Sequence, residues 1–142
     1  MTQFTFKKKE RLKSRKTIGR LFAGGQSFGM YPLRLVFLKE EEPKSGTPVE
    51  FGVSVPKRSF KSAVARNRLK RKVREAWRLN KHQLYQRLAG KPWQYAFMVI
   101  YVAKEDLTYE VIEKAMQAMI RWFIKKNVPP HANPPEGPRP LS

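Results

Sequence analysis

The chain has 142 residues and carries 30 Lys and Arg against 11 Asp and Glu, which gives a formal net charge of +19. Concentrating this charge on one small domain is self-repulsive, so the composition favours a polyanionic partner such as nucleic acid. A membrane partner would require an amphipathic anchor, a lipidation signal or a span of ~20 apolar residues, and none is expected from this sequence. Cysteine is absent, which excludes disulfides and thiolate metal sites and fits the cytoplasmic location that we expect.

The N-terminal part of the sequence predicts a flexible segment followed by one short helix. Residues 1–9 are basic, lack the apolar run of a secretory signal, and are expected to be flexible. Ser14 can cap a helix that runs to about Ala23, and two glycines follow to end it. The apolar residues that share one face of this helix are Ile18, Leu21 and Phe22.

Two strands are predicted next. Residues 31–39 have apolar side chains on both faces, and residues 49–55 alternate between apolar and polar and are rich in β-branched side chains. A charged loop with turn residues, 40–48, separates them. We therefore expect the two strands to pair as a hairpin.

A long basic segment, a third strand and a last helix complete the predicted domain. The basic segment covers residues 57–88 and is treated below as a helix. Residues 94–103 are apolar throughout, which is typical of a strand covered on both faces. The last helix starts after Thr108, a suitable N-cap, and ends near Asn127.

The order helix, strand, strand, helix, strand, helix predicts a single small α+β domain over residues 10–127. Residues 128–142 contain six prolines in fifteen positions. Such a segment can neither continue a helix nor join a sheet, so a disordered tail is expected there.

The basic segment is amphipathic when its residues are placed on a helix. Between Lys57 and Arg78 there are ten Lys or Arg and one Glu. Lys70, Arg74 and Arg78 repeat like charge at i,i+4, which is unfavourable unless an outside partner compensates it. The stripe suited to pack against a core comprises Leu69, Val73, Ala76, Trp77, Asn80 and Leu84.

This charge pattern favours nucleic acid over an ordinary solvated helix face, because solvated faces normally interleave both signs. Charge alone leaves RNA and DNA open. A helix fits the major groove of DNA, but that of RNA is too deep and narrow, so a helix bound to RNA would contact phosphates and shape. Arg66 is an exception, because it projects along the apolar stripe and must either snorkel or reach a ligand.

Residues 65–77, with the sequence ARNRLKRKVREAW, resemble the Arg-Asn-Arg signature of the protein subunit of bacterial ribonuclease P. Residues 52–58, 11–13 and 107–110 resemble the family's strand before the signature, its N-terminal region and the start of its last helix. The resemblance covers roughly residues 8–126. One departure is the turn at Phe60-Lys61-Ser62, where the family usually has Gly; another is Ile18, which replaces a common aromatic.

The resemblance implies an α+β fold with a sheet of about four strands, three helices and a left-handed βαβ crossover through the signature helix. It implies a protein that assists a catalytic RNA, with Mg²⁺ at the RNA active site, in removing the 5′ leader from precursor tRNA. The residues carried over to contact the catalytic RNA are Arg66, Asn67, Arg68, Lys70, Arg71 and Arg74. Those carried over to a cleft for the leader are Ile18, Phe22, Ser54, Lys57 and Arg58.

A nuclease that works without RNA would need clustered carboxylates or histidines to hold metal ions. The chain has one Asp, Asp106, and two His, His82 and His131, and we expect no catalytic residue and no metal ligand among them. We also expect no obligatory protein partner. The alternative is a structural RNA binder such as a ribosomal protein or RNA chaperone. A subunit that binds the leader requires Phe22 and the Lys57-Arg58 pair to face one groove, whereas a structural binder does not.

Overall fold

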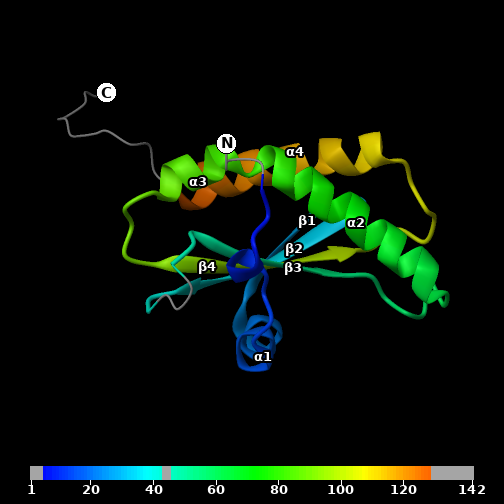
Figure 1. Cartoon of the computed structure of the whole chain (residues 1–142), viewed down its shortest axis with the longest axis horizontal. Helices are drawn as coiled ribbons and strands as arrows, with labels where there is room; N and C mark the ends of the chain where they lie inside the picture. The colour runs from blue at the N-terminus through cyan, green and yellow to red at the C-terminus, as the bar shows by residue number, and fades with distance from the viewer. Residues whose placement is uncertain (1–4, 43–45, 129–142) are drawn as a thin grey trace.

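The computed structural model describes residues 5–42 and 46–128. A four-stranded sheet is covered by one helix on one face and by three on the other (Figure 1). The helices are α1 (Arg15–Gly24), α2 (Ala63–Asn80), α3 (His82–Leu88) and α4 (Tyr109–Asn127). The strands are β1 (Gln26–Met30), β2 (Leu33–Glu40), β3 (Val49–Ser54) and β4 (Gln94–Tyr101). The predicted α+β class is confirmed.

The strand order is β1-β2-β4-β3, so β4 lies between β2 and β3. The predicted hairpin of residues 31–39 with 49–55 is therefore wrong: β2 pairs with β4 antiparallel, and β3 pairs with β4 parallel. The physical reason is that β4, apolar on both faces, gains most from the covered centre of the sheet. β1 was not predicted, because its sequence, QSFGM, mixes polar residues with a glycine.

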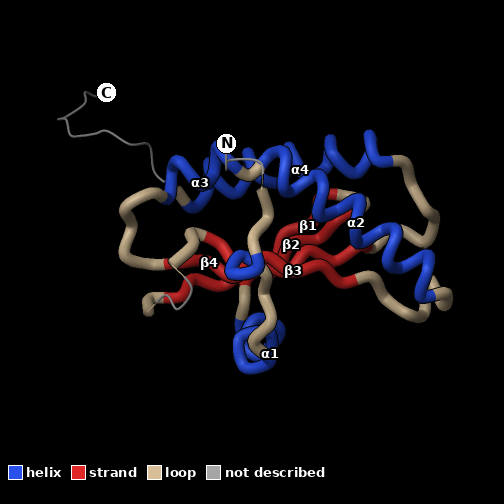
Figure 2. The backbone as a smooth tube through the Cα atoms, in the orientation of Figure 1, coloured by secondary structure: helices blue, strands red, loops and turns tan. Residues whose placement is uncertain are grey.

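The parallel pairing of β3 with β4 requires a crossover, and α2 and α3 supply it (Figure 2). This confirms the βαβ unit; its left hand stays an expectation from the resemblance. The predicted helix of 57–88 is shorter and divided. Residues 57–59 form a turn, and Lys81 separates α2 from α3, which raises the number of α-helices in the described chain to four.

The main core lies between the sheet and the layer formed by α2, α3 and α4. Trp77 of α2 stacks on Phe51 of β3, with ring centroids 4.4 Å apart, and both side chains are fully buried. The apolar members of the predicted stripe on the basic segment are all buried there. Asn80 is only half-buried, and its amide donates to the Ala76 carbonyl and to Glu113.

A smaller core on the other face holds α1 against the sheet. It consists of Leu12, Leu21, Val36, Ala96 and Met98. The Ser14 hydroxyl accepts a hydrogen bond from the Thr17 amide and caps α1, as predicted. No helix in the described part of the chain combines the length and the apolarity that crossing a membrane requires.

A buried ion pair anchors the N-terminal segment beneath the junction of α2 and α3. Lys81 and Glu10 are 2% and 5% exposed, and the ammonium of Lys81 also bonds the Thr5 carbonyl. The Tyr85 hydroxyl donates to Glu10 at 2.7 Å. Residues 5–9, placed in the segment predicted to be flexible, are thus in contact with the domain, whereas residues 1–4 and the predicted tail beyond Val128 lie outside the described residues.

The pKa of Glu10 reflects two opposing effects. Burial raises this pKa. The hydrogen bonds from Lys81, the Lys7 amide and Tyr85 together lower it by more than burial raises it, so the net pKa lies below the ordinary value. A carboxyl with a lowered pKa stabilises the fold above its unfolded pKa, and this contribution is lost as the pH falls through the folded pKa.

We expect Lys81→Met to lower the free energy of unfolding by about 3 kcal/mol at pH 7, because it leaves a buried carboxylate without its cation. Without Lys81 the pKa of Glu10 should rise, so the loss should shrink as the pH falls from 7 to 4. Urea unfolding across this range measures both effects. Lys39→Met, at an exposed lysine, is the control, and Glu10→Gln added to Lys81→Met should recover stability. A loss that is independent of pH would contradict this account.

Candidate nucleic-acid interface

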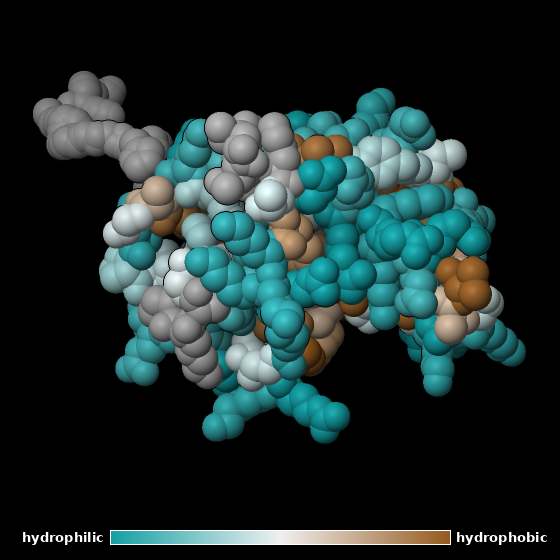
Figure 3. Space-filling view, in the orientation of Figure 1, coloured by the Kyte–Doolittle hydropathy of each residue, from teal (hydrophilic) through white to brown (hydrophobic). Residues whose placement is uncertain are grey.

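α2 carries the Arg-Asn-Arg signature, and Ser62 starts it. The Ser62 hydroxyl accepts a hydrogen bond from the Ala65 amide at 3.2 Å, which satisfies one of the free amides of the first turn. Leu69, Val73 and Trp77 turn one stripe of the helix into the core. The cations of the signature region are left on the remaining surface, and Figure 3 shows that hydrophilic residues cover most of the molecule over α2.

Arg66 binds its own chain. Its Nη1 donates to the Phe60 carbonyl at 2.8 Å and to the Lys61 carbonyl at 2.9 Å. These two carbonyls belong to the turn where the sequence departs from the family pattern. The guanidinium that projects along the apolar stripe therefore fixes the entry into α2.

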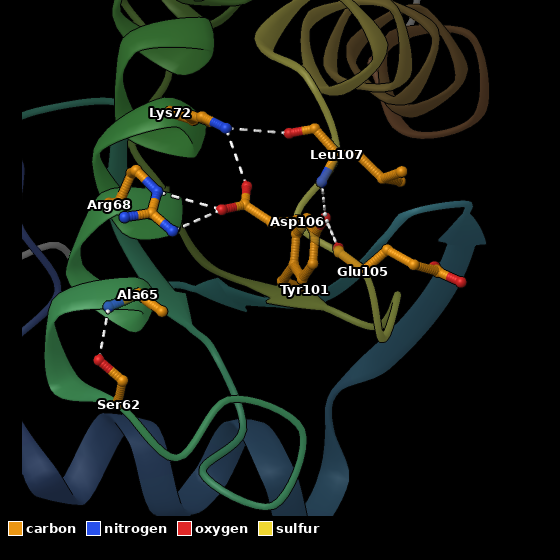
Figure 4. Close-up of polar contacts among 8 residues, drawn as sticks. All are labelled: Ser62, Ala65, Arg68, Lys72, Tyr101, Glu105, Asp106 and Leu107. Carbon is orange, nitrogen blue, oxygen red and sulfur yellow. Dashed lines mark hydrogen bonds and ion pairs between the residues drawn. The ribbon is translucent and has the colours of Figure 1, made fainter.

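Arg68 and Lys72 share one carboxylate, that of Asp106. Asp106 Oδ2 accepts from Arg68 Nε at 3.0 Å and Nη2 at 2.7 Å, and Oδ1 accepts from Lys72 Nζ at 2.9 Å (Figure 4). The hydrogen bonds from Lys72 and Arg68 hold the pKa of Asp106 below its ordinary value. Local sequence patterns do not predict this contact, because 34 residues or more separate the partners.

Three further cations of the signature region have no ion-pair partner among the described residues. Within the described chain, Lys70, Arg71 and Arg74 form no ion pair, whereas Arg78 pairs with Glu75 at 2.7 Å. Arg71 and Asn67 are exposed, and Lys70 and Arg74 are half-buried. We call the surface formed by Asn67, Lys70, Arg71 and Arg74 the α2 flank. Its cations keep their positive charge because none of them forms an ion pair within the described chain.

Positive charge continues from the α2 flank across the β3 edge of the sheet. The pKa of Arg74 is lowered by burial and by the nearby charge of Arg11, which forms a single parallel bridge with Phe51 of β3. A hollow of about 430 Å³ opens beside Arg11 and the start of α1. Its lining residues are Lys8, Lys9, Arg11, Lys13, Ser14, Thr17 and Glu50.

A second surface lies on the face of the sheet that carries α1. The strand registers place Gly29, Arg34, Ile100 and Ser54 in one row across all four strands. Arg34 is exposed, and its guanidinium lies over Gly29, where an added Cβ would come 3.2 Å from Nη2. Ser54 and Ile100 are half-buried. We call this row the sheet row.

Helix geometry places Ile18 and Phe22 on the side of α1 away from Arg20, and Ile18 packs in the same small core as Ile100 of the sheet row. Arg20 reaches the opposite end of β2, where it pairs with Glu40 at 2.8 Å. At 100° per residue, Ile18 and Phe22 each lie roughly 160° around the helix from Arg20. Ile18 is half-buried, and Phe22 is 56% exposed.

Lys57 and Arg58 lie in the turn that begins three residues after Ser54, the last residue of β3, and both are exposed. The structure therefore groups the residues predicted for the leader at one end of the α1 face and in this turn. The turn leads into α2, so it joins this surface to the α2 flank. Arg34 and Asp106 complete the two surfaces and were missed, although Arg34 is the one cation between Leu33 and Leu38.

The comparisons with known proteins identify the family. The family model described as Ribonuclease P matches residues 6–123. The chain belongs to the ribonuclease P protein family. The ribonuclease P protein component of Porphyromonas gingivalis is 41% identical over 131 residues, covering 91% of this chain and 93% of the relative. That of Clostridioides difficile is 28% identical, covering 82% and 93%.

Two solved structures share the fold. The RNase P protein of Staphylococcus aureus has a TM-score of 0.60 at 23% identity, covering 84% of this chain and 98% of that one. The RNase P protein of Thermotoga maritima has a TM-score of 0.62 at 22% identity, covering 79% and 96%.

We expect Arg66→Ala to lower the free energy of unfolding by about 1–2 kcal/mol, because it removes two charged hydrogen bonds to partly exposed carbonyls. Asn67→Ala, at the exposed neighbour, is the matched control and should change stability by less than about 0.5 kcal/mol. Urea unfolding compares the two variants. Equal stability of both would show that Arg66 does not fix the turn.

Proposed function

We propose that this protein is the RNA-binding subunit of a ribonuclease P holoenzyme that removes the 5′ leader from precursor tRNA in the cytoplasm. In this proposal the α2 flank binds the catalytic RNA, and the sheet row, together with Ile18, Phe22, Lys57 and Arg58, binds the leader. The observation that carries the proposal is the α2 flank in a member of this family: its cations pair with no acid of the described chain, and the other side of the same helix is buried in the core.

The α2 flank suits the backbone of a folded RNA. Lys70, Arg71 and Arg74 carry charge that no acid of the described chain neutralises, and phosphates would release counterions on binding them. A helix cannot enter the deep, narrow major groove of RNA, so these side chains would contact phosphates and ribose across its surface. Asn67, exposed between Arg66 and Arg68, adds an amide with both donor and acceptor capacity.

The sheet row suits a single strand. Phe22 offers an exposed ring on which a base can stack, Arg34 and Arg58 offer charge for phosphates, and Ser54 offers a hydroxyl. An aromatic surface beside cations binds single-stranded RNA with little sequence preference. A subunit that acts on many precursor tRNAs needs such tolerance, because their leaders differ.

Hydrolysis belongs to the RNA in this proposal, with Mg²⁺ held at the RNA active site and none held by the protein alone. The placement of the acids in the described chain supports this division. Glu40, Glu75 and Asp106 are each bound to a cation of the chain, and among the described residues no three acids or histidines gather in a group that could hold a metal ion. The protein would act by reducing the repulsion between two RNAs.

A cleavage assay tests the proposed function. Precursor tRNA is incubated at low magnesium with the protein, with a bacterial ribonuclease P RNA, or with both. We expect little cleavage by either alone and strong cleavage by both, because the protein's cations replace part of the magnesium needed for charge screening. Cleavage by nuclease-free protein alone would refute the subunit role, and a lack of stimulation would favour a structural RNA binder.

Matched variants locate the RNA surface in the same assay. Arg71→Ala with Arg74→Ala should remove most of the stimulation. Lys125→Ala with Lys126→Ala removes the same charge from exposed residues at the end of α4 and should leave it nearly unchanged. Equal losses would mean that net charge, not the α2 flank, is responsible.

We expect Phe22→Ala to weaken the binding of precursor tRNA with a leader by about 1–3 kcal/mol, the range for one base stacked on a ring. A tRNA without a leader should bind with equal affinity to the holoenzyme with the variant and to the unchanged holoenzyme. Val111→Ala, at an exposed apolar residue of α4, is the control. Filter binding measures the affinities, and an equal loss for both RNAs would refute this placement of the leader.

A further inference from the structure

The contact of Asp106 with Arg68 and Lys72 joins α2 to the connection between β4 and α4 (Figure 4). Asp106 is the single Asp of the chain. Lys72 Nζ also donates to the Leu107 carbonyl at 3.0 Å. One acid, placed by a different element, thus lies among the cations of the signature helix.

The connection that carries Asp106 is fixed on both sides. The Tyr101 hydroxyl donates to the Glu105 carbonyl at 2.5 Å and accepts from the Leu107 amide at 3.0 Å. Thr108 then caps α4 by accepting from the Val111 amide. Because its neighbours are held, Asp106 meets Arg68 and Lys72 at a defined position.

The position of Asp106 matters for any polyanion. Its carboxylate accepts hydrogen bonds from Nε and Nη2 of Arg68 and from Nζ of Lys72, so these two cations of α2 are already paired. The side chains of Arg68 and Asp106 are still 47% and 31% exposed, so an RNA phosphate can reach the cluster. The cluster keeps a net charge of +1, whereas Arg68 and Lys72 without Asp106 would carry +2, so it attracts a phosphate less strongly than two unpaired cations would.

We propose that Asp106 is a specificity-determining residue. By pairing with Arg68 and Lys72, it reduces their binding to RNAs that do not fit the surface formed by these two residues and the α2 flank. This inference rests on the proposed function, since the RNA that fits is the catalytic RNA. A flexible, non-cognate strand that binds the sheet row can continue along Lys70, Arg71 and Arg74, and it leaves the cluster paired. An RNA shaped to the whole surface places a phosphate at Arg68 and Lys72 and offsets the lost pairing with its other contacts.

Binding of two RNAs to Asp106→Asn tests this inference. The probes are poly(U) of about 30 nucleotides, a length that exceeds single-strand sites of ~16 nucleotides, and a bacterial ribonuclease P RNA. For poly(U) we expect affinity to rise about two- to fivefold, the equivalent of one exposed ion pair. The slope of log K against log salt should steepen by about 0.7 for each phosphate gained. For the ribonuclease P RNA the gain should be smaller, so the ratio of the two affinities should fall.

Glu40→Gln is the matched control. It removes the same charge from an ion pair of similar length, 2.8 Å, which joins Glu40 of β2 to Arg20 of α1. It should leave the ratio of affinities unchanged. Arg68→Gln supplies an independent readout: it should weaken binding of the ribonuclease P RNA by a larger factor than binding of poly(U). Thermal unfolding checks that each variant is folded, and exposed ion pairs of this kind contribute little to stability.

Several outcomes would overturn the inference. Weaker binding of both RNAs by Asp106→Asn would make Asp106 a residue that positions Arg68. Equal gains for both RNAs, or the same gains with Glu40→Gln, would reduce its role to net charge. If the unchanged protein binds ribonuclease P RNA no better than poly(U), the proposed function fails instead. The poly(U) affinities of Asp106→Asn and Glu40→Gln still measure how far Asp106 reduces the binding of a single strand.

Discussion

β4 runs through the centre of the sheet, and seven of its eight residues are buried. Tyr95, Phe97 and Val99 belong to the core beneath α2 and α4, whereas Ala96 and Met98 belong to the core beneath α1. A strand that is apolar on both faces must be covered on both. This requirement places α1 and α2 on opposite faces, so the sheet separates the two surfaces proposed for RNA, and the turn between β3 and α2 joins them.

Three of the chain's acids each bind a cation outside the α2 flank, so the positive charge of the α2 flank is not neutralised by them. Glu10 lies in the interior with Lys81, Glu40 binds Arg20 at the far side of α1, and Asp106 binds Arg68 and Lys72. The α2 flank keeps the rest of its charge unpaired. The repulsion this causes costs stability, and the burial of Leu69, Val73, Ala76 and Trp77 on the other side of the same helix offsets it.

Local patterns predicted several elements well. Ser14 and Thr108 cap α1 and α4 as predicted, the stripe from Leu69 to Leu84 packs into the core, and β4 is covered on both faces. The hairpin was wrong because neighbouring strands in sequence need not be neighbours in a sheet. β1 was missed because five residues containing Gln, Ser and Gly carry too weak an apolar pattern, although Phe28 stacks on Trp122 once the fold is formed.

The class of fold, the amphipathic basic helix and its resemblance to the ribonuclease P protein can be predicted from the amino-acid sequence, since charge, periodicity and a contiguous motif are local properties. The contacts of each signature arginine depend on the folded chain. Arg66 binds the Phe60 and Lys61 carbonyls, and Arg68 binds Asp106. The strand registers likewise place Arg34 in one row with Ser54. These partners are set by strand order and by the path of the connection from β4 to α4, and such long-range contacts form only when the core has fixed the elements that carry them.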